Sequence, residues 1–390
     1  MKNQKILTFP IFFIYFNSSL QAFLFALTLP TLSYFIAEKF SADAFYIGLF
    51  FILISLSSIL FSQLMGHFSD RLNDRRPLIL LGILCGSTSC YLFSISSSYE
   101  IALISGVSFF SLSFASIPQT FAHARDYAEH KFNRKNLIMF NTILRACSAF
   151  SWVGGPAIGF LLIDYFNFKQ YYLIVALMYL ACATSTLLTL PKVQKLAKKN
   201  HKSDNSRNKQ ITIAFIGFSL IFGCNQSYLI SLPLYITQVL NLDVSWSGWL
   251  MGTAAAIEIP IMIFAGWLGT RFSLPSLICI GSVASITLYF GFWHATELWV
   301  LFPLQICNAL MIGFVAGLGM TWFQDLMPDR AGAASALFWN TTNVGNILGA
   351  ITITFFAQLL GYRNVYLVNT GMALIAALLL IYIARVSRNS

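Results

Sequence analysis

Two residues of opposite charge, Arg145 and Glu258, interrupt long apolar segments of the sequence. Counted along a helix at 1.5 Å per residue, Arg145 lies ~15 Å and Glu258 ~18 Å inside its segment. An ionisable group at bilayer depth is costly unless it faces a water-filled cavity or a partner. A carboxylate there can take up and release a proton, and a guanidinium can donate hydrogen bonds to a hydroxyl. The two residues therefore suggest either proton-coupled chemistry or a structural ion pair.

Amide side chains recur within the apolar segments, many of them three or four residues apart, which puts them on one helix face. They offer donors and acceptors without charge, as a neutral, hydroxyl-rich ligand requires. The polar set comprises Asn17 and Gln21, Asn225, Gln226 and Tyr228, Gln305 and Asn308, and Asn340 and Asn343. Amides also bond membrane helices to one another, so we expect about half of the set to contact a ligand. The residues assigned to ligand contact are Asn17, Gln21, Arg145, Asn225, Gln226, Asn308, Asn340 and Asn343.

The composition excludes an ordinary soluble protein. Hydrophobic residues make up 57% of the chain and charged residues only 10%, against about a quarter charged in soluble proteins. The seven cysteines show no zinc-type spacing. Neither His-Glu-x-x-His nor Gly-x-Ser-x-Gly occurs. We therefore expect a membrane protein that is not an enzyme and has no metal or cofactor.

Apolar helices of about 20 residues cross a bilayer, and the sequence accommodates twelve of them. The predicted spans are 8–36, 45–66, 77–97, 99–123, 135–163, 168–190, 211–239, 246–269, 275–294, 297–323, 331–360 and 363–385. The long polar connection at residues 191–210 predicts a cytoplasmic linker. It would join an N-terminal six-helix bundle, residues 1–190, to a C-terminal one, residues 211–390. The fold class is therefore an all-α membrane protein.

Basic residues predict the orientation of the spans. With the N-terminus inside, all 24 Lys and Arg except Lys39, Arg145, Lys169 and Arg363 fall in cytoplasmic segments. The positive-inside rule then makes both termini cytoplasmic. The net charge of +10 thereby has a topological explanation, and no nucleic-acid partner is expected.

The two halves repeat each other at an offset near 200 residues. Pro30 corresponds to Pro233, Gly48 to Gly248, and the run from Gly66 to Arg71 to the run from Gly266 to Arg271. Such parallel repeats are related by an axis along the membrane normal. The repeat predicts two pseudo-symmetric bundles.

The connection between the second and third spans reads Gly66-His-Phe-Ser-Asp70-Arg71-Leu-Asn-Asp74-Arg75-Arg76. It resembles the signature of the major facilitator superfamily, Gly-x-x-x-Asp-Arg-x-x-Arg-Arg, with one extra residue before the Arg pair. The resemblance implies the major facilitator fold and a conformational latch formed by Gly66, Asp70, Arg71, Arg75 and Asp126. In that latch Asp70 meets the start of span 331–360, and the motif arginine meets Asp126. The alternative is a basic loop that only sets topology.

Three longer stretches, residues 118–128, 250–260 and 317–333, resemble the bacterial sugar efflux transporter family within that superfamily. The resemblance implies export of a small sugar or glycoside in exchange for protons, by a multi-pass protein of the bacterial inner membrane. We expect a monomer in the lipid bilayer. The alternative is a multidrug–proton antiporter, favoured by the many Phe and by Gly154-Gly155-Pro156. Against it, span 99–123 lacks a mid-helix Arg.

The same resemblance gives Arg145 and Glu258 a joint role. It makes spans 135–163 and 246–269 neighbours across the two halves, and the estimated depths of the two residues match. Protonation of Glu258 would then release Arg145 for a sugar hydroxyl and couple proton to sugar movement. The alternative is a structural ion pair between the halves.

Overall fold

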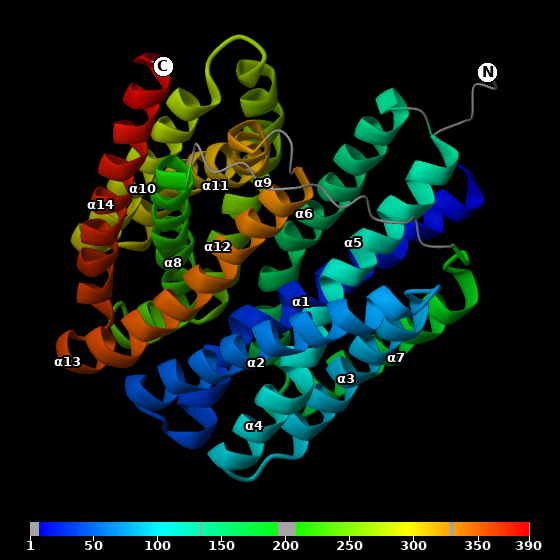
Figure 1. Cartoon of the computed structure of the whole chain (residues 1–390). Coiled ribbons are helices and arrows are strands. Elements are labelled where there is room, and N and C mark those ends of the chain that lie inside the picture. The colour runs from blue at the N-terminus through cyan, green and yellow to red at the C-terminus, as the bar shows by residue number, and fades with distance from the viewer. Residues whose placement is uncertain (1–7, 133, 194–207, 328–330, 390) are drawn as a thin grey trace. The chain divides into compact units, whose positions relative to one another are not determined.

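The computed structural model describes residues 8–132, 134–193, 208–327 and 331–389, and their regular structure is helical throughout (Figure 1). A few side chains inside the helices lie outside this description, among them those of Asp70, Arg71 and Arg145. Long uninterrupted helices are the expected outcome for such an apolar chain. Within lipid each backbone N–H and C=O must find its partner inside its own segment.

The first half of the chain forms seven α-helices and one π-helical turn among the described residues. They are α1 (Phe9–Phe40), α2 (Ala44–Arg71), α3 (Arg76–Ile95), α4 (Tyr99–Ser105), η1 (Gly106–Phe110), α5 (Ser111–Lys131), α6 (Arg134–Tyr165) and α7 (Phe168–Thr189). α4, η1 and α5 follow one another without a break and form a single span. Helix α1 packs against α6 and α7, and α3 packs against α7 and α5 (Figure 1).

The second half forms the remaining elements. They are α8 (Asn208–Gln238), α9 (Ser245–Gly269), α10 (Leu274–His294), α11 (Leu298–Leu326), α12 (Ala331–Thr352), η3 (Ile353–Ala357), α13 (Gln358–Leu360) and α14 (Tyr362–Asn389). Helix α8 packs against α12 and α14, and α10 packs against α14 and α11. This is the pairing that the first half shows between α1, α6 and α7 and between α3, α7 and α5, so the structure repeats as the sequence does.

Eleven described segments are long and apolar enough to cross a membrane. The last of them, Leu337–Arg385, has 49 residues and would be ~74 Å long as one helix, more than twice a bilayer core. Gly361, at φ 79°, breaks it between α13 and α14. Most L-residues avoid this backbone conformation. The segment therefore holds two crossings, which accounts for the twelve predicted spans.

The described residues separate into two compact units. Unit 1 contains the residues up to Phe40 together with Leu53 to residue 193, and unit 2 contains Ser41–Ile52 together with the residues from 208 onward. The first turns of α2 thus pack within unit 2. Most of the predicted linker, residues 191–210, lies outside the described ranges, and the predicted domain boundaries remain predictions.

Glycines allow close helix approach in both units. A Cβ atom on Gly155 of α6 would lie 2.6 Å from the Ala26 side chain of α1. A Cβ atom on Gly349 of α12 would lie 2.6 Å from the Gly223 carbonyl and 2.7 Å from the Ser227 nitrogen of α8. Small residues at such crossings are typical of membrane helix pairs. They set the spacing between α1 and α6 and between α8 and α12.

Candidate functional site

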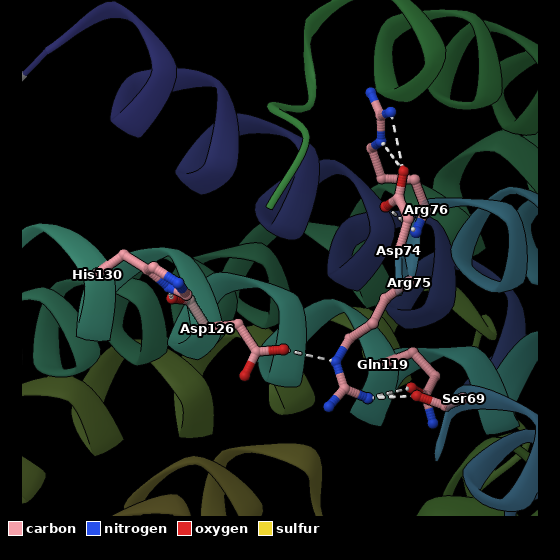
Figure 2. Close-up of polar contacts among 7 residues, drawn as sticks. All are labelled: Ser69, Asp74, Arg75, Arg76, Gln119, Asp126 and His130. Atoms are coloured by element: carbon pink, nitrogen blue, oxygen red, sulfur yellow. Dashed lines mark hydrogen bonds and ion pairs between the residues drawn. The ribbon is translucent and has the colours of Figure 1, made fainter. Parts of the chain in front are cut away.

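A semi-buried ion pair joins the start of α3 to α5 (Figure 2). The Arg75 Nε donates to the Asp126 carboxylate at 2.8 Å, and the two side chains are 11% and 14% exposed. The same guanidinium donates to the Gln119 amide oxygen at 3.0 Å and to the Ser69 hydroxyl. Charge-assisted bonds from a planar fork fix orientation as well as distance. Arg75 thereby connects α2, α3 and α5 within unit 1.

The extra residue of the signature motif is Asp74, and it has a structural task. Its carboxylate accepts from the Arg76 backbone N–H at 3.1 Å and from the Arg76 Nε at 2.9 Å (Figure 2). It therefore satisfies a backbone donor at the start of α3, where a negative charge is also favoured. Arg76 Nη1 also donates to the Leu190 carbonyl just past the end of α7, at 3.2 Å.

The predicted latch has a second contact, from Asp70 to the start of α12. The Asp70 and Arg71 side chains and those of residues 331–333 lie outside the described part, so this contact remains a prediction. A Cβ atom on Gly66 would meet nothing within 4 Å. Packing within the described residues therefore gives no reason for glycine there.

The two amides assigned on α1 are engaged in interhelical hydrogen bonds. Asn17 donates to the Phe13 carbonyl at 2.8 Å and to the Thr189 hydroxyl of α7 at 2.9 Å. It also accepts from the Thr186 hydroxyl at 3.2 Å. With 3% of Asn17 exposed, its donors and one acceptor position are used inside the bundle. This geometry does not support the expected contact with a ligand and favours a tie between α1 and α7.

Gln21 makes the corresponding tie between α1 and α5. Its Nε2 donates to the Ser116 hydroxyl at 3.0 Å, and its Oε1 accepts from the Thr120 hydroxyl at 2.6 Å. Ser116, Thr120 and the Arg75 partner Gln119 are not among the residues predicted from the sequence. The signal available for them was a polar face of α5 that repeats at helical spacing: Ser113, Ser116, Gln119, Thr120 and His123.

In unit 2 a buried cluster joins α8 to α11. The Gln305 Oε1 accepts from the Tyr228 hydroxyl at 3.1 Å and from the Asn308 Nδ2 at 3.2 Å. Its own Nε2 donates to the Leu301 carbonyl at 3.0 Å. Gln305 is fully buried, so it holds Tyr228 and Asn308 in fixed orientations. It belongs to the polar set of the sequence but not to the residues predicted to contact a ligand.

Four assigned amides in unit 2 have no hydrogen bond among the residues the structure describes: Asn225 and Gln226 of α8, and Asn340 and Asn343 of α12. Asn340 is exposed, Asn225 and Asn343 are partly exposed, and Gln226 is 6% exposed. α8 and α12 pack against each other, and Gln226 lies beside Gly349. Unit 2 therefore carries amides with unused donors and acceptors on two adjacent helices.

Glu258 lies on α9, is partly exposed and forms no ion pair among the described residues. Arg145 lies on α6, and its side chain is outside the described part. Their pairing therefore remains a prediction. Within the described ranges, no cluster of three or more His, Cys, Asp or Glu could hold a metal ion.

Comparison with known proteins matches the Major Facilitator Superfamily over residues 11–350 and 248–390. Sugar efflux transporter A of Dickeya chrysanthemi is 36% identical over 350 residues, covering 89% of this chain and 88% of that protein. Sugar efflux transporter C of Escherichia coli is 34% identical over 368 residues, covering 92% of each. Among solved structures, a mutant nucleoside transporter aligns at TM-score 0.79 with 16% identity, covering 96% of this chain and 99% of the other.

The structural likeness establishes the fold, and the sequence matches establish the family. They confirm the predicted all-helical fold and the predicted membership. This chain belongs to the major facilitator superfamily, is related within it to the sugar efflux transporters, and is a multi-pass membrane transporter rather than an enzyme.

Proposed function

We propose that this transporter exports sugars or glycosides from the cytoplasm by alternating access, in exchange for protons. The observation that carries the proposal is a set of amides on α8 and α12 that have no hydrogen bond among the described residues: Asn225, Gln226, Asn340 and Asn343. A polar group in a membrane helix that lacks a protein partner is unfavourable unless water or a ligand supplies one. Sugar hydroxyls both donate and accept, as an amide does.

The buried cluster around Gln305 adds a second surface of the same chemistry. The Gln305 Oε1 accepts from the Tyr228 hydroxyl and from the Asn308 Nδ2. These bonds fix the orientations of the Tyr228 and Asn308 side chains. Preorganised polar groups bind a ligand with less loss of conformational entropy. We propose that Asn308 contacts the sugar and that Gln305 positions it, while Asn17 and Gln21 act mainly as ties within unit 1.

The relatives support the choice of substrate class. Proteins called sugar efflux transporters are 34–36% identical to this chain over about nine-tenths of its length. We propose the orientation that the positive-inside rule gives, with both termini in the cytoplasm of a bacterial cell and a monomer in the inner membrane. Glu258 is the proposed proton carrier and Arg145 its proposed partner.

A multidrug–proton antiporter is the second candidate, and one observation favours it. In unit 1 the Phe25 ring stacks on Phe114 at 4.9 Å and on Phe110 at 5.9 Å, with Trp152 at 6.2 Å. Such a cluster suits flat apolar cations, which gain from contact with aromatic faces. The amides of unit 2 have no evident use in that function.

Transport by the purified protein in proteoliposomes tests the proposal. Vesicles are loaded with labelled lactose or with a fluorescent cationic drug, and the outside is made acidic. We expect the gradient to accelerate lactose exit, and Glu258→Gln to abolish that acceleration while sugar exchange continues. If the gradient moved the drug but no sugar, the result would favour the multidrug–proton antiporter over the sugar exporter. Undiminished acceleration in Glu258→Gln would remove the coupling role of Glu258.

A further inference from the structure

Two fully buried polar side chains of unit 2, Ser227 on α8 and Asn369 on α14, lack hydrogen-bond partners within the described ranges. The atoms concerned are the Ser227 hydroxyl oxygen and both the Oδ1 and the Nδ2 of Asn369. A buried amide or hydroxyl without a hydrogen bond costs free energy, and nearly all such groups are paired with protein or with ordered water. These three atoms therefore call for a partner other than the described side chains.

Contacts along α8 and α14 place the two residues opposite each other. The Cys224 Sγ donates to the Asn369 carbonyl at 3.4 Å, and the Ser231 hydroxyl donates to the Tyr366 hydroxyl at 3.3 Å. Residue numbers rise along α8 as they fall along α14, so the two helices are antiparallel. Ser227 lies three residues after Cys224 and four before Ser231, and hence on the same face of α8. It therefore faces the turn of α14 that runs from Tyr366 to Asn369.

The side chains of Ser227 and Asn369 lean toward each other. A Cα–Cβ bond tilts toward the N-terminus of its own helix. In this antiparallel pair the tilt brings the Ser227 hydroxyl toward the level of Asn369, and the Asn369 amide toward the level of Ser227. Neither side chain bonds the other or a carbonyl of its own helix. A small molecule that both donates and accepts can therefore connect them.

Unit 1 contains a direct form of the same connection. Its helices α1 and α7 correspond to α8 and α14 in the repeated helix pairing. There the Asn17 amide donates to the Thr189 hydroxyl and accepts from the Thr186 hydroxyl, with no molecule between them. In unit 2 an amide and a hydroxyl again face each other across the corresponding helix pair, but without a direct bond.

We propose that at least one water molecule is bound between Ser227 and Asn369 and bridges α8 to α14 inside unit 2. Water can accept from the Asn369 Nδ2 and donate to the Ser227 oxygen, or accept from the Ser227 hydroxyl and donate to the Asn369 Oδ1. A buried water typically makes about three hydrogen bonds to polar groups that otherwise lack partners. The flanking Cys224, Ser231 and Tyr366 are also fully buried. The water is thus part of the packed interior and separate from the amides proposed to contact a sugar.

A structure of the purified full-length protein, at a resolution that shows ordered water, tests the proposal directly. We expect density within hydrogen-bond distance of both the Ser227 hydroxyl and the Asn369 amide, and loss of that density in Asn369→Leu. A direct bond between Ser227 and Asn369, with no density between the helices at this level, would overturn the proposal.

Thermal unfolding in detergent gives a second, independent test. Asn369→Leu and Ser227→Ala should each lower the unfolding temperature by about 3 °C, because each removes the bridge between the helices. The double variant should lose clearly less than the two single losses combined, since either change alone already breaks the bridge. Ser282→Ala is the matched control, because this fully buried serine donates to the Cys279 carbonyl of its own helix at 2.8 Å. It should show no such coupling to Asn369→Leu.

A dry site gives the opposite result. Without water, Asn369→Leu replaces an amide that has no partner by an apolar side chain, and the unfolding temperature should rise. A rise in both Asn369→Leu and Ser227→Ala, or losses that add in full in the double variant, would contradict the bridge. If Asn369→Leu does not accumulate in the membrane, the density in the wild-type protein and the unfolding temperature of Ser227→Ala decide the outcome.

Discussion

At the scale of single residues, the amides of the two units differ in how many of their hydrogen-bond donors and acceptors are used within the described residues. Asn17 and Gln21 use their donors and acceptors on Thr and Ser hydroxyls of neighbouring helices. Asn225 and Gln226 have no such partner among the described residues. A hydrogen bond already made inside a bundle contributes to stability, whereas an unmade one is available to a ligand.

Gln226→Ala and Asn17→Ala should therefore have different effects. Loss of one hydrogen bond to a sugar, about 1 kcal/mol, corresponds to about a fivefold rise in KM for Gln226→Ala. Asn17→Ala should lower the unfolding temperature in detergent by a few degrees, because interhelical bonds in membranes are worth about 0.6 kcal/mol each. Transport kinetics and thermal unfolding of both variants give the comparison. A larger KM change in Asn17→Ala than in Gln226→Ala would contradict it.

At the scale of elements, one guanidinium holds α2, α3 and α5 together at the Arg75 end of unit 1. The Arg75 fork reaches Asp126, Gln119 and Ser69 at once. Lysine carries the same charge but is a point donor without the planar fork. The arrangement therefore depends on the planar geometry of the guanidinium as well as on its charge, and its role as a conformational latch remains a prediction.

Arg75→Lys should lower the transport rate about tenfold while the protein still reaches the membrane. Asp126→Asn should do the same, because it leaves a semi-buried guanidinium without its counter-charge. Exchange of the pair, Arg75→Asp with Asp126→Arg, should recover part of the rate. Initial rates normalised to the amount of protein in the membrane give the answer. Wild-type rates in both single variants would show that the motif is only a topological loop.

Some elements and contacts are predictable from the sequence, and others are not. The bilayer sets helix length, so the predicted span 168–190 corresponds to α7, Phe168–Thr189. The signature motif pointed to Asp126, which the structure pairs with Arg75. The partners of Asn17 were not predictable, because Thr186 and Thr189 are about 170 residues away and their register depends on packing. The π-turn at η3 has no local sequence signal either.

At the scale of the whole molecule, a repeated arrangement of six spans provides the scaffold for an asymmetric set of polar groups. Each unit repeats the same helix pairing, as expected of parallel repeats. Unit 1 contains the Arg75 cluster, and unit 2 contains the amides that have no hydrogen bond among the described residues. Under the proposed function, the ligand contacts would come mainly from unit 2, and the predicted latch would lie in unit 1.

Substrate counterflow tests the central proposal, sugar transport, most directly and without any ion gradient. Proteoliposomes containing the purified protein are filled with unlabelled lactose and diluted into a trace of labelled lactose at equal pH on both sides. Uptake should pass through a transient maximum above equilibrium, and this overshoot should shrink in Gln226→Ala. If no neutral sugar gives an overshoot while a cationic drug does, the proposed function is wrong.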